Sequence, residues 1–409
     1  MAKEYKDLVV GLDIGTSKVM AVVAEVLPDG QLKIAGLGIA PGNGLKRGVV
    51  VNIDATVQSI QQALKEAELM ADCKITRVNV GITGSHIRGI NSSGMVAIKD
   101  KEVTQADVAR VMETARAINI STDQRLLLVA PQEFVIDGQE VKEPIGMSGM
   151  RLEAKVHIVT GAQSAAENII KCVRRCGLEV DQLLLNPLSS SLAVLTEDER
   201  ELGVACVDIG AGTTDVAIFT NGAIRHTAVI PIAGDLITSD IAMALRTPTK
   251  DAEDIKVESG CAKQLLADPE AQVEVPGLGD RAPRMLSKQA LAGVIEPRVE
   301  EIFSLVQQVI RESGYEEVLS SGIVLTGGSA VMPGMVELGE DIFLKPVRRG
   351  VPKYNGALSD MVSQPRVATV MGLMEEARLA RLRGFKVSQK KGSMNNAFTR
   401  FKDFIVGNF

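Results

Sequence analysis

A motif that occurs twice limits the folds open to this chain more than any other feature. The sequence Asp-Ile-Gly stands at 13–15 between two apolar runs, and it returns at 208–210 between two more, 195 residues further along a chain of 409. Two apolar runs joined by a tight glycine turn predict a β-hairpin. A repeat spaced at nearly half the chain predicts two related lobes, each built around one hairpin.

The residue types in both hairpins suit a bound phosphate chain. Glycines allow the backbone to approach a ligand closely, successive N–H groups in a bend bind anions, and hydroxyls are further donors. The predicted phosphate-binding residues are Gly15, Thr16, Ser17, Lys18, Gly210, Gly212, Thr213 and Thr214. Asp13 and Asp208 would hold Mg²⁺ through water, since magnesium prefers carboxylate and phosphate oxygens. A lone Asp-x-Gly is as often an ordinary turn, but two copies favour a clamp around a magnesium polyphosphate.

A third glycine motif lies in SGIVLTGGSAVMPG, residues 321–334. It predicts an apolar strand that ends at Gly327 and Gly328, followed by a turn into a helix that begins near Pro333 and Gly334. Bare backbone there lets a flat or sugar-like group lie against it, and helix N–H groups favour phosphate. Other nucleotide motifs do not fit. The sequence has no Gly-x4-Gly-Lys-Ser/Thr run, and its Gly-x-Gly-x-x-Ala match at 277–282 lies between prolines, which predicts a loop.

Composition argues against several classes of protein. A net charge of −6 disfavours a broad nucleic-acid-binding surface, and the sequence has no apolar run long enough to cross a membrane. Five scattered cysteines and a start without a secretory signal predict a reduced, cytosolic protein. Cys172 and Cys176 would share a helix face, but the three histidines offer no companion spacing, so core packing is favoured over a zinc site.

The three glycine motifs, in this order and spacing, resemble the phosphate-1, phosphate-2 and adenosine motifs of the actin/Hsp70/sugar-kinase ATPases. Within that superfamily the chain is most similar to the bacterial cell-division protein FtsA family, through stretches that cover almost its whole length. Among these are EPIGMSGMRLEAKVHIVTG (143–161), CGLEVDQLL (176–184) and TEDERELGVACVDIGAGTTD (196–215). The resemblance implies an α/β, actin-like two-lobed ATPase fold that binds ATP and Mg²⁺.

The resemblance also implies a division into subdomains. We expect a first-lobe core (1–83 and 162–195) with an FtsA-type inserted subdomain (84–161), a second-lobe core (196–233 and 321–383) with an outer subdomain (234–320), a linker (384–393) and a terminal amphipathic helix (394–409). Segments 183–195 and 367–382 resemble the helices that connect the lobes. The inserted subdomain should hold a helix at 104–117 capped by Thr104. The outer subdomain should hold helices at 235–246, 251–266 and 287–312.

Family resemblance further implies a scaffold in cell division. Such a protein self-assembles, binds the C-terminal tail of FtsZ and other division proteins, and tethers the FtsZ ring to the cytoplasmic face of the inner membrane at the division site. Arg298 and Glu301 are the expected FtsZ-tail contacts, and Glu253 and Lys256 are expected ribose or base contacts, although charges at this spacing also suit a solvated helix face. The alternatives are an actin-like pilus-assembly ATPase and a soluble enzyme of the Hsp70 or sugar-kinase type.

The last sixteen residues form an amphipathic pattern. At 100° per residue, one face collects Met394, Ala397, Phe398, Phe401, Phe404, Ile405 and Phe409. Arg400 and Lys402 flank this face, where long side chains reach lipid headgroups. Such a helix is about 24 Å long, too short to span a bilayer, so it would lie in the surface. Docking on the protein's own core is the alternative, but the polar, lysine-bearing linker favours an anionic membrane.

Hydrolysis depends on one further position. Actin-like ATPases that turn over carry Gln or Glu at the start of the first connecting helix, where it orients the attacking water. The matching residue here is Asn186, which is one methylene shorter than Gln and cannot act as a base. An Asn-Pro pair also suits a helix cap. We therefore expect slow ATP hydrolysis at most.

Overall fold

Each lobe is built on a five-stranded sheet, and the two sheets share one topology. The computed structural model describes residues 7–279 and 281–382. The first sheet runs in the order β11 (Glu179–Leu185), β6 (Arg77–Ile82), β1 (Leu8–Ile14), β2 (Lys18–Val26), β3 (Leu32–Pro41). The second runs β14 (Ala223–Ile230), β13 (Thr214–Thr220), β12 (Val204–Ile209), β17 (Ile323–Thr326), β18 (Val347–Arg349).

The strand directions repeat as well. In each sheet the hairpin and the strand beyond it are antiparallel, and two parallel strands lie on the other side of the hairpin's first strand. The central strands β1 and β12 are buried over nearly their full length, which accounts for their continuous apolar sequences. Both predicted hairpins are confirmed, and the repeat in sequence is a repeat in structure.

Helices cover the sheets and connect the lobes. They are α1 (Ile53–Ala71), α3 (Gln163–Arg175), α4 (Asn186–Val194), α5 (Glu197–Leu202), α9 (Met335–Phe343), α10 (Ser359–Val362) and α11 (Ala368–Leu382), with a small ribbon of β4 (Leu45–Lys46) and β5 (Val49–Val50). Connecting helices α4 and α11 pack against each other, and a Cβ added at Gly372 would lie 1.7 Å from the Ser189 carbonyl oxygen. Glycine is therefore required where these two helices meet.

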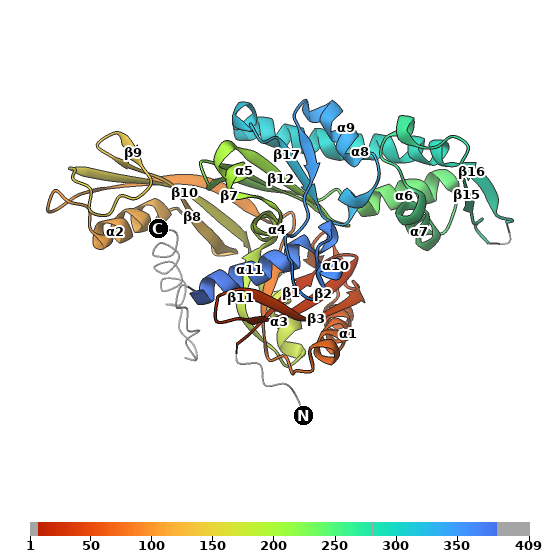
Figure 1. Ribbon diagram of the computed structural model, residues 1–409, viewed down its shortest axis with the longest axis horizontal. Helices are drawn as coiled ribbons and strands as arrows, with labels where there is room; N and C mark the ends of the chain where they lie inside the picture. Colours follow the sequence, from red (N-terminus) through yellow and green to blue (C-terminus); the bar gives the residue numbers. More distant parts are fainter. Residues whose placement is uncertain (1–6, 280, 383–409) are drawn as a thin grey trace.

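The inserted subdomain is an antiparallel sheet with one helix. Its strands run β7 (Arg88–Ala97), β10 (Arg151–Ala162), β8 (Gln124–Ile136), β9 (Gln139–Val141), and α2 (Gln105–Arg116) packs on the sheet. The predicted cap is confirmed: the Thr104 hydroxyl accepts from the Asp107 amide, and the Asp107 carboxylate accepts from the Thr104 amide. This subdomain has a core of its own and extends from one side of the molecule (Figure 1).

The outer subdomain lies at the end of the second lobe that is farther from the inserted subdomain (Figure 1). It consists of α6 (Gly234–Leu245), α7 (Thr249–Ser259), α8 (Lys288–Ser313) and the hairpin of β15 (Gln272–Val275) and β16 (Arg284–Ser287). The expected helix over 251–266 is wrong in extent. Helix α7 stops at Ser259 because Gly260 turns to an extended conformation, and only a 3₁₀ turn, Gln264–Leu266, follows. Two other 3₁₀ turns, Ser329–Val331 and Pro365–Val367, flank the site described next.

Candidate nucleotide site

The two hairpin turns face each other across a cleft between the lobes. They are built alike: the Gly15 amide donates to the Lys18 carbonyl oxygen at 2.9 Å, and the Gly210 amide donates to the Thr213 carbonyl oxygen at the same distance. Both glycines stand two positions after the aspartate. A Cβ added at Gly212 would lie 2.5 Å from Thr16 Oγ1, so the turns touch across the cleft. The duplicated motif therefore forms one composite site.

The third glycine motif borders the same cleft. Gly327 follows β17 with a φ of +89°, and a Cβ there would lie 2.3 Å from Asp208 Oδ1. Only glycine combines this backbone conformation with that close approach. Gly328 also lines the cleft, and the predicted turn into a helix is confirmed, since α9 begins just after Gly334.

Three carboxylates are buried around this cleft. Burial raises the pKa of Asp13 to about 6, against the opposing effect of nearby Lys18. Burial also raises the pKa of Asp208, whose Oδ2 accepts from Thr369 Oγ1 at 3.0 Å, and raises that of Asp215 well above its usual value. Such shifts mean that the folded protein holds these negative charges at a cost. A cation beside them would lower that cost, which fits a magnesium nucleotide.

Lys18 and Arg366 are the cationic side chains that line the cleft, and Lys18 belongs to the first turn. It stands at the end of the first turn, and burial lowers its pKa, although Asp13 acts in the opposite direction. A compact ammonium group at the edge of a glycine turn suits a phosphate oxygen. Within the described chain, no three His, Cys, Asp or Glu side chains are arranged to hold a metal ion directly. The expected magnesium contact through water needs no such cluster.

Asn186 lines the cleft and does not cap its helix. The N-cap of α4 is Leu185, with no side-chain cap hydrogen bond, so the capping alternative is wrong. The Asn186 side chain is buried, and its Oδ1 has no hydrogen-bond partner among the described residues. A Cβ at Gly81 would lie 2.2 Å from this oxygen, so Gly81 leaves room for the amide. A buried amide oxygen without a partner can accept from a water or ligand donor.

Sequence reasoning missed several residues of the cleft. Thr83, Asp215, Pro365, Arg366 and Thr369 line it beside the predicted residues. Thr83 Oγ1 donates to Asp215 Oδ1 at 2.7 Å, which joins the end of β6 in the first lobe to β13 in the second. Asp215 could have been predicted from the sequence, because it is the last residue of the second glycine motif, DIGAGTTD. Nothing local marked Thr83 or Thr369.

Three of the predicted residues lie beside the cleft without lining it. Thr214 is fully buried, and its hydroxyl donates to the Ile232 carbonyl oxygen. Lys256 Nζ donates to the Gly234 carbonyl oxygen at 3.2 Å and to Glu253 Oε2 at 2.6 Å. The Gly234 amide in turn donates to the Gly210 carbonyl oxygen, so this pair supports the second turn from behind. Their contact with a ribose or base stays a prediction.

The expected partner residues are engaged within the outer subdomain. Arg298 on α8 donates from Nε and Nη2 to the Asp240 carboxylate of α6, at 2.5 and 3.0 Å, and it also pairs with Glu301. The pair thus fixes α8 against α6, and binding of a partner there stays a prediction. The linker and the amphipathic segment, 384–409, lie outside the described residues. Among residues 7–279 and 281–382, no helix is long and apolar enough to cross a membrane.

A second and larger cavity lies away from the glycine turns. It measures about 630 Å³, compared with about 70 Å³ for the cleft, and lies between the inserted subdomain and the second lobe. Size alone would favour it as the main site. The cleft nevertheless carries the glycine turns, the buried carboxylates and Lys18, which together suit a nucleotide, and the larger cavity has none of these.

Comparison with known proteins agrees with this geometry. A family model of cell division protein FtsA matches residues 205–372, and a model of the SHS2 domain inserted in FtsA matches residues 84–160. The chain is 56% identical over 409 residues to the cell division protein FtsA of Pseudomonas aeruginosa, with 98% of each chain covered. This chain belongs to the FtsA family. It is also 47% identical to the FtsA of Escherichia coli K12, over 94% of each chain.

Solved structures place the FtsA fold of this chain among the actin-like proteins. The PilM-PilN type IV pilus biogenesis complex matches with a TM-score of 0.64 at 19% identity, over 90% of this chain and 98% of the other. MreB5 of Spiroplasma citri bound to ADP matches with a TM-score of 0.56 at 15% identity, over 93% and 99%. At such identities the likeness concerns the fold alone, so the sequence relatives decide between cell division and pilus assembly.

Proposed function

We propose that this FtsA-family chain binds Mg-ATP between its lobes, assembles into filaments and tethers FtsZ to the cytoplasmic face of the inner membrane. The observation that carries the nucleotide part is the composite cleft: two matched glycine turns, a third glycine motif, buried carboxylates and one lysine. The solved relative with ADP supports a nucleotide in this fold. The family assignment supports the division role.

The residues fit the proposed nucleotide. The turns at Gly15 and Gly210 would hold the phosphates with backbone N–H groups, and the backbone at Gly327 and Gly328 would face the adenosine. Asp13 and Asp208 would hold the waters of Mg²⁺, whose charge would stabilise the polyphosphate. Because the cleft measures only about 70 Å³, well below ordinary ligand pockets, nucleotide entry requires the lobes to separate. Binding is thereby coupled to lobe movement.

Hydrolysis would be slow in this proposal. The residue at the start of the connecting helix is Asn186, and its amide can orient a water but cannot accept a proton as a base. Its buried Oδ1 supports a water-holding role. ATP would act chiefly as a ligand that sets the positions of the lobes and the contacts between subunits.

Membrane attachment would come from the terminal amphipathic segment. Burying one Phe fully contributes about 1.5–3 kcal/mol, and partial insertion of four, less the ordering of a helix, leaves only a few kcal/mol. One tail is therefore a marginal anchor. Filament formation would link many tails and raise membrane affinity by roughly 10²–10⁴ without new contacts. The outer subdomain, with α8 exposed along one face, would receive the FtsZ tail near Arg298 and Glu301.

The experiment that tests the anchor is co-sedimentation of the full chain with anionic vesicles. Replacing Phe401 and Phe404 by Glu places charge at the centre of the apolar face and should abolish vesicle binding while ATP binding is kept. The matched control replaces Asn396 and Thr399 by Glu, which adds the same charge on the polar face. The proposed membrane anchor would be refuted if the control lost as much vesicle binding as the Phe401 and Phe404 variant, or if that variant bound vesicles like the wild type.

A further inference from the structure

The larger cavity has the shape and lining of a docking groove. Its walls come from β8 and β9 of the inserted subdomain, from α5 and β14 of the second lobe, and from the connecting helices α4 and α11. Its volume of about 630 Å³ falls within the range of ordinary ligand pockets, roughly 300–1,000 Å³. Leu188, Leu192 and Leu379 are half-buried there, so apolar surface is available to an occupant.

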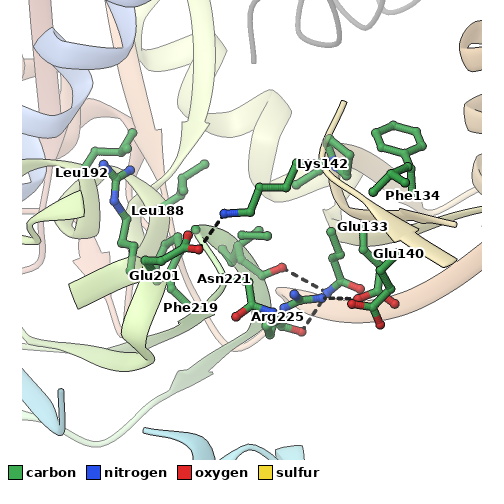
Figure 2. A pocket seen from close by; sticks show the side chains of 18 of the residues that line it. Glu133, Phe134, Glu140, Lys142, Leu188, Leu192, Glu201, Phe219, Asn221 and Arg225 are labelled. Carbon is green, nitrogen blue, oxygen red and sulfur yellow. Dashed lines mark hydrogen bonds and ion pairs between the residues drawn. The ribbon is translucent and has the colours of Figure 1, made fainter. Parts of the chain in front are cut away.

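Charge is arranged around this apolar surface. The lining carries four carboxylates and three cations: Glu133, Glu140, Glu201, Glu376, Lys142, Arg200 and Arg225. Lys142 reaches across from beside β9 to Glu201, at 2.6 Å, and Arg225 is paired with Glu133 within the wall (Figure 2). Glu140 and Glu201 are exposed at the rim, as is Lys142, and the lining has one carboxylate more than it has cations. An occupant with an apolar face and flanking cations would match this arrangement.

The chain itself supplies such a segment at the edge of the groove. Glu376 and Leu379 of α11 line the cavity, and Leu382, the last residue that the structure describes, lies within one helical turn of Leu379. In Figure 1 this end of α11 points to the side of the inserted subdomain. Residues 383–409 hold six Lys or Arg and one Asp, which gives this segment a net charge of +5. Because the whole chain has a net charge of −6, residues 1–382 carry −11 and attract the segment.

We propose that residues 394–409 dock in this cavity in cis, with the phenylalanine face on the leucines and the cations at the glutamate rim. For a random coil of eleven residues, the length of segment 383–393, the mean end-to-end distance is roughly 18 Å, which is enough to reach the cavity. A segment tethered over that distance has an effective concentration in the millimolar range, so weak intrinsic affinity is sufficient. Docking hides the phenylalanines from lipid, and the docked protein is the form that stays off the membrane.

This regulation rests on the proposed membrane anchor only in its second step. The docking step needs no lipid and is tested without it. Amide hydrogen exchange of the full-length protein is compared with that of the F401E/F404E variant, at two protein concentrations. The groove amides of 139–142 and 221–224 should exchange at least about threefold faster in the variant. Equal exchange overturns the proposal, and protection that grows with protein concentration overturns docking in cis in favour of a second copy's tail.

The competition step is tested with a variant of the groove. Glu140→Lys with Glu201→Lys reverses the rim charge and should increase vesicle affinity about three- to tenfold, because more tails are undocked. The control, Glu113→Lys with Glu258→Lys, makes the same change in net charge at exposed sites outside the groove. Equal affinity of rim variant and control overturns the competition. If instead the F401E/F404E protein still binds vesicles, the anchor fails while the exchange result stands on its own.

Discussion

The ionised form of Asp13 should destabilise the folded protein in the absence of nucleotide. Its folded pKa of about 6 lies above the ordinary value of 3.8, so the folded state binds the proton more tightly than the unfolded state does. The stabilising contribution of that proton is complete below pH 3.8 and is lost as pH rises through 6. The full difference between the two pKa values is about 2, which corresponds to about 3 kcal/mol at 1.36 kcal/mol for each pKa unit.

Urea unfolding followed by circular dichroism measures this effect. Between pH 5 and pH 7.5 the Asp13 contribution should fall by about 1.4 kcal/mol, because the rest of the contribution is lost between pH 3.8 and pH 5, where the unfolded state releases its proton and the folded state keeps it. Asp13→Asn removes the titration, so the wild type should lose about 1.4 kcal/mol more than the variant over this interval. Buried groups remote from Asp13, such as His157, titrate alike in both proteins, so their effects cancel in the comparison.

A control variant and the addition of Mg-ATP show whether the pH effect belongs to Asp13. Asp100→Asn changes an exposed carboxylate and should leave the wild-type pH dependence unaltered. Saturating Mg-ATP should reduce the penalty in the wild type, because a nearby cation favours the ionised carboxylate. The same pH dependence in wild type and Asp13→Asn would refute the assignment of a strained carboxylate to the cleft.

Three more predictions concern single residues. Burial lowers the pKa of His157 to about 3, so the free energy of unfolding should fall as pH drops below 6.5, and amide hydrogen exchange in β7 and β14 should become faster. His157→Gln should remove this pH dependence; if the variant keeps it, His157 is not its source. Asp208→Ala should weaken ATP binding, measured by calorimetry, in the presence of Mg²⁺ but not in its absence. If Mg²⁺ strengthens ATP binding equally in the wild type and the variant, Asp208 does not hold magnesium. Phosphate release should stay well below 1 s⁻¹; faster release that disappears in Asn186→Ala would identify a true enzyme.

The phosphate turns were predictable because their signals are local. An apolar run, an aspartate, a glycine turn and a second apolar run lie within about 20 residues, so the sequence of each copy is enough to predict its hairpin. The equivalent hydrogen bonds at Gly15 and Gly210 follow from equal spacing after each aspartate. The Thr104 cap was predictable for the same reason, since its partner Asp107 is three residues away.

The rest of the cleft depends on how distant segments meet. Thr83 joins Asp215 because the end of β6 faces the second lobe, and Thr369 reaches Asp208 because α11 returns between the lobes. The sequence around each threonine does not predict which distant segment it will meet. The capping role for Asn186 was wrong because β11 runs directly into α4, which leaves Leu185 at the cap. The 251–266 helix was too long because Gly260, within an otherwise helical pattern, ends α7.

Recruitment of FtsZ to vesicles tests the tether most directly. Purified FtsZ is mixed with anionic vesicles, Mg-ATP and the full-length protein, and the vesicles are sedimented. We predict that FtsZ sediments with the wild-type chain and the N396E/T399E control, and stays in the supernatant with F401E/F404E or without the chain. FtsZ that sediments equally with F401E/F404E, or that stays in solution while the wild-type chain is on the vesicles, would contradict the tether.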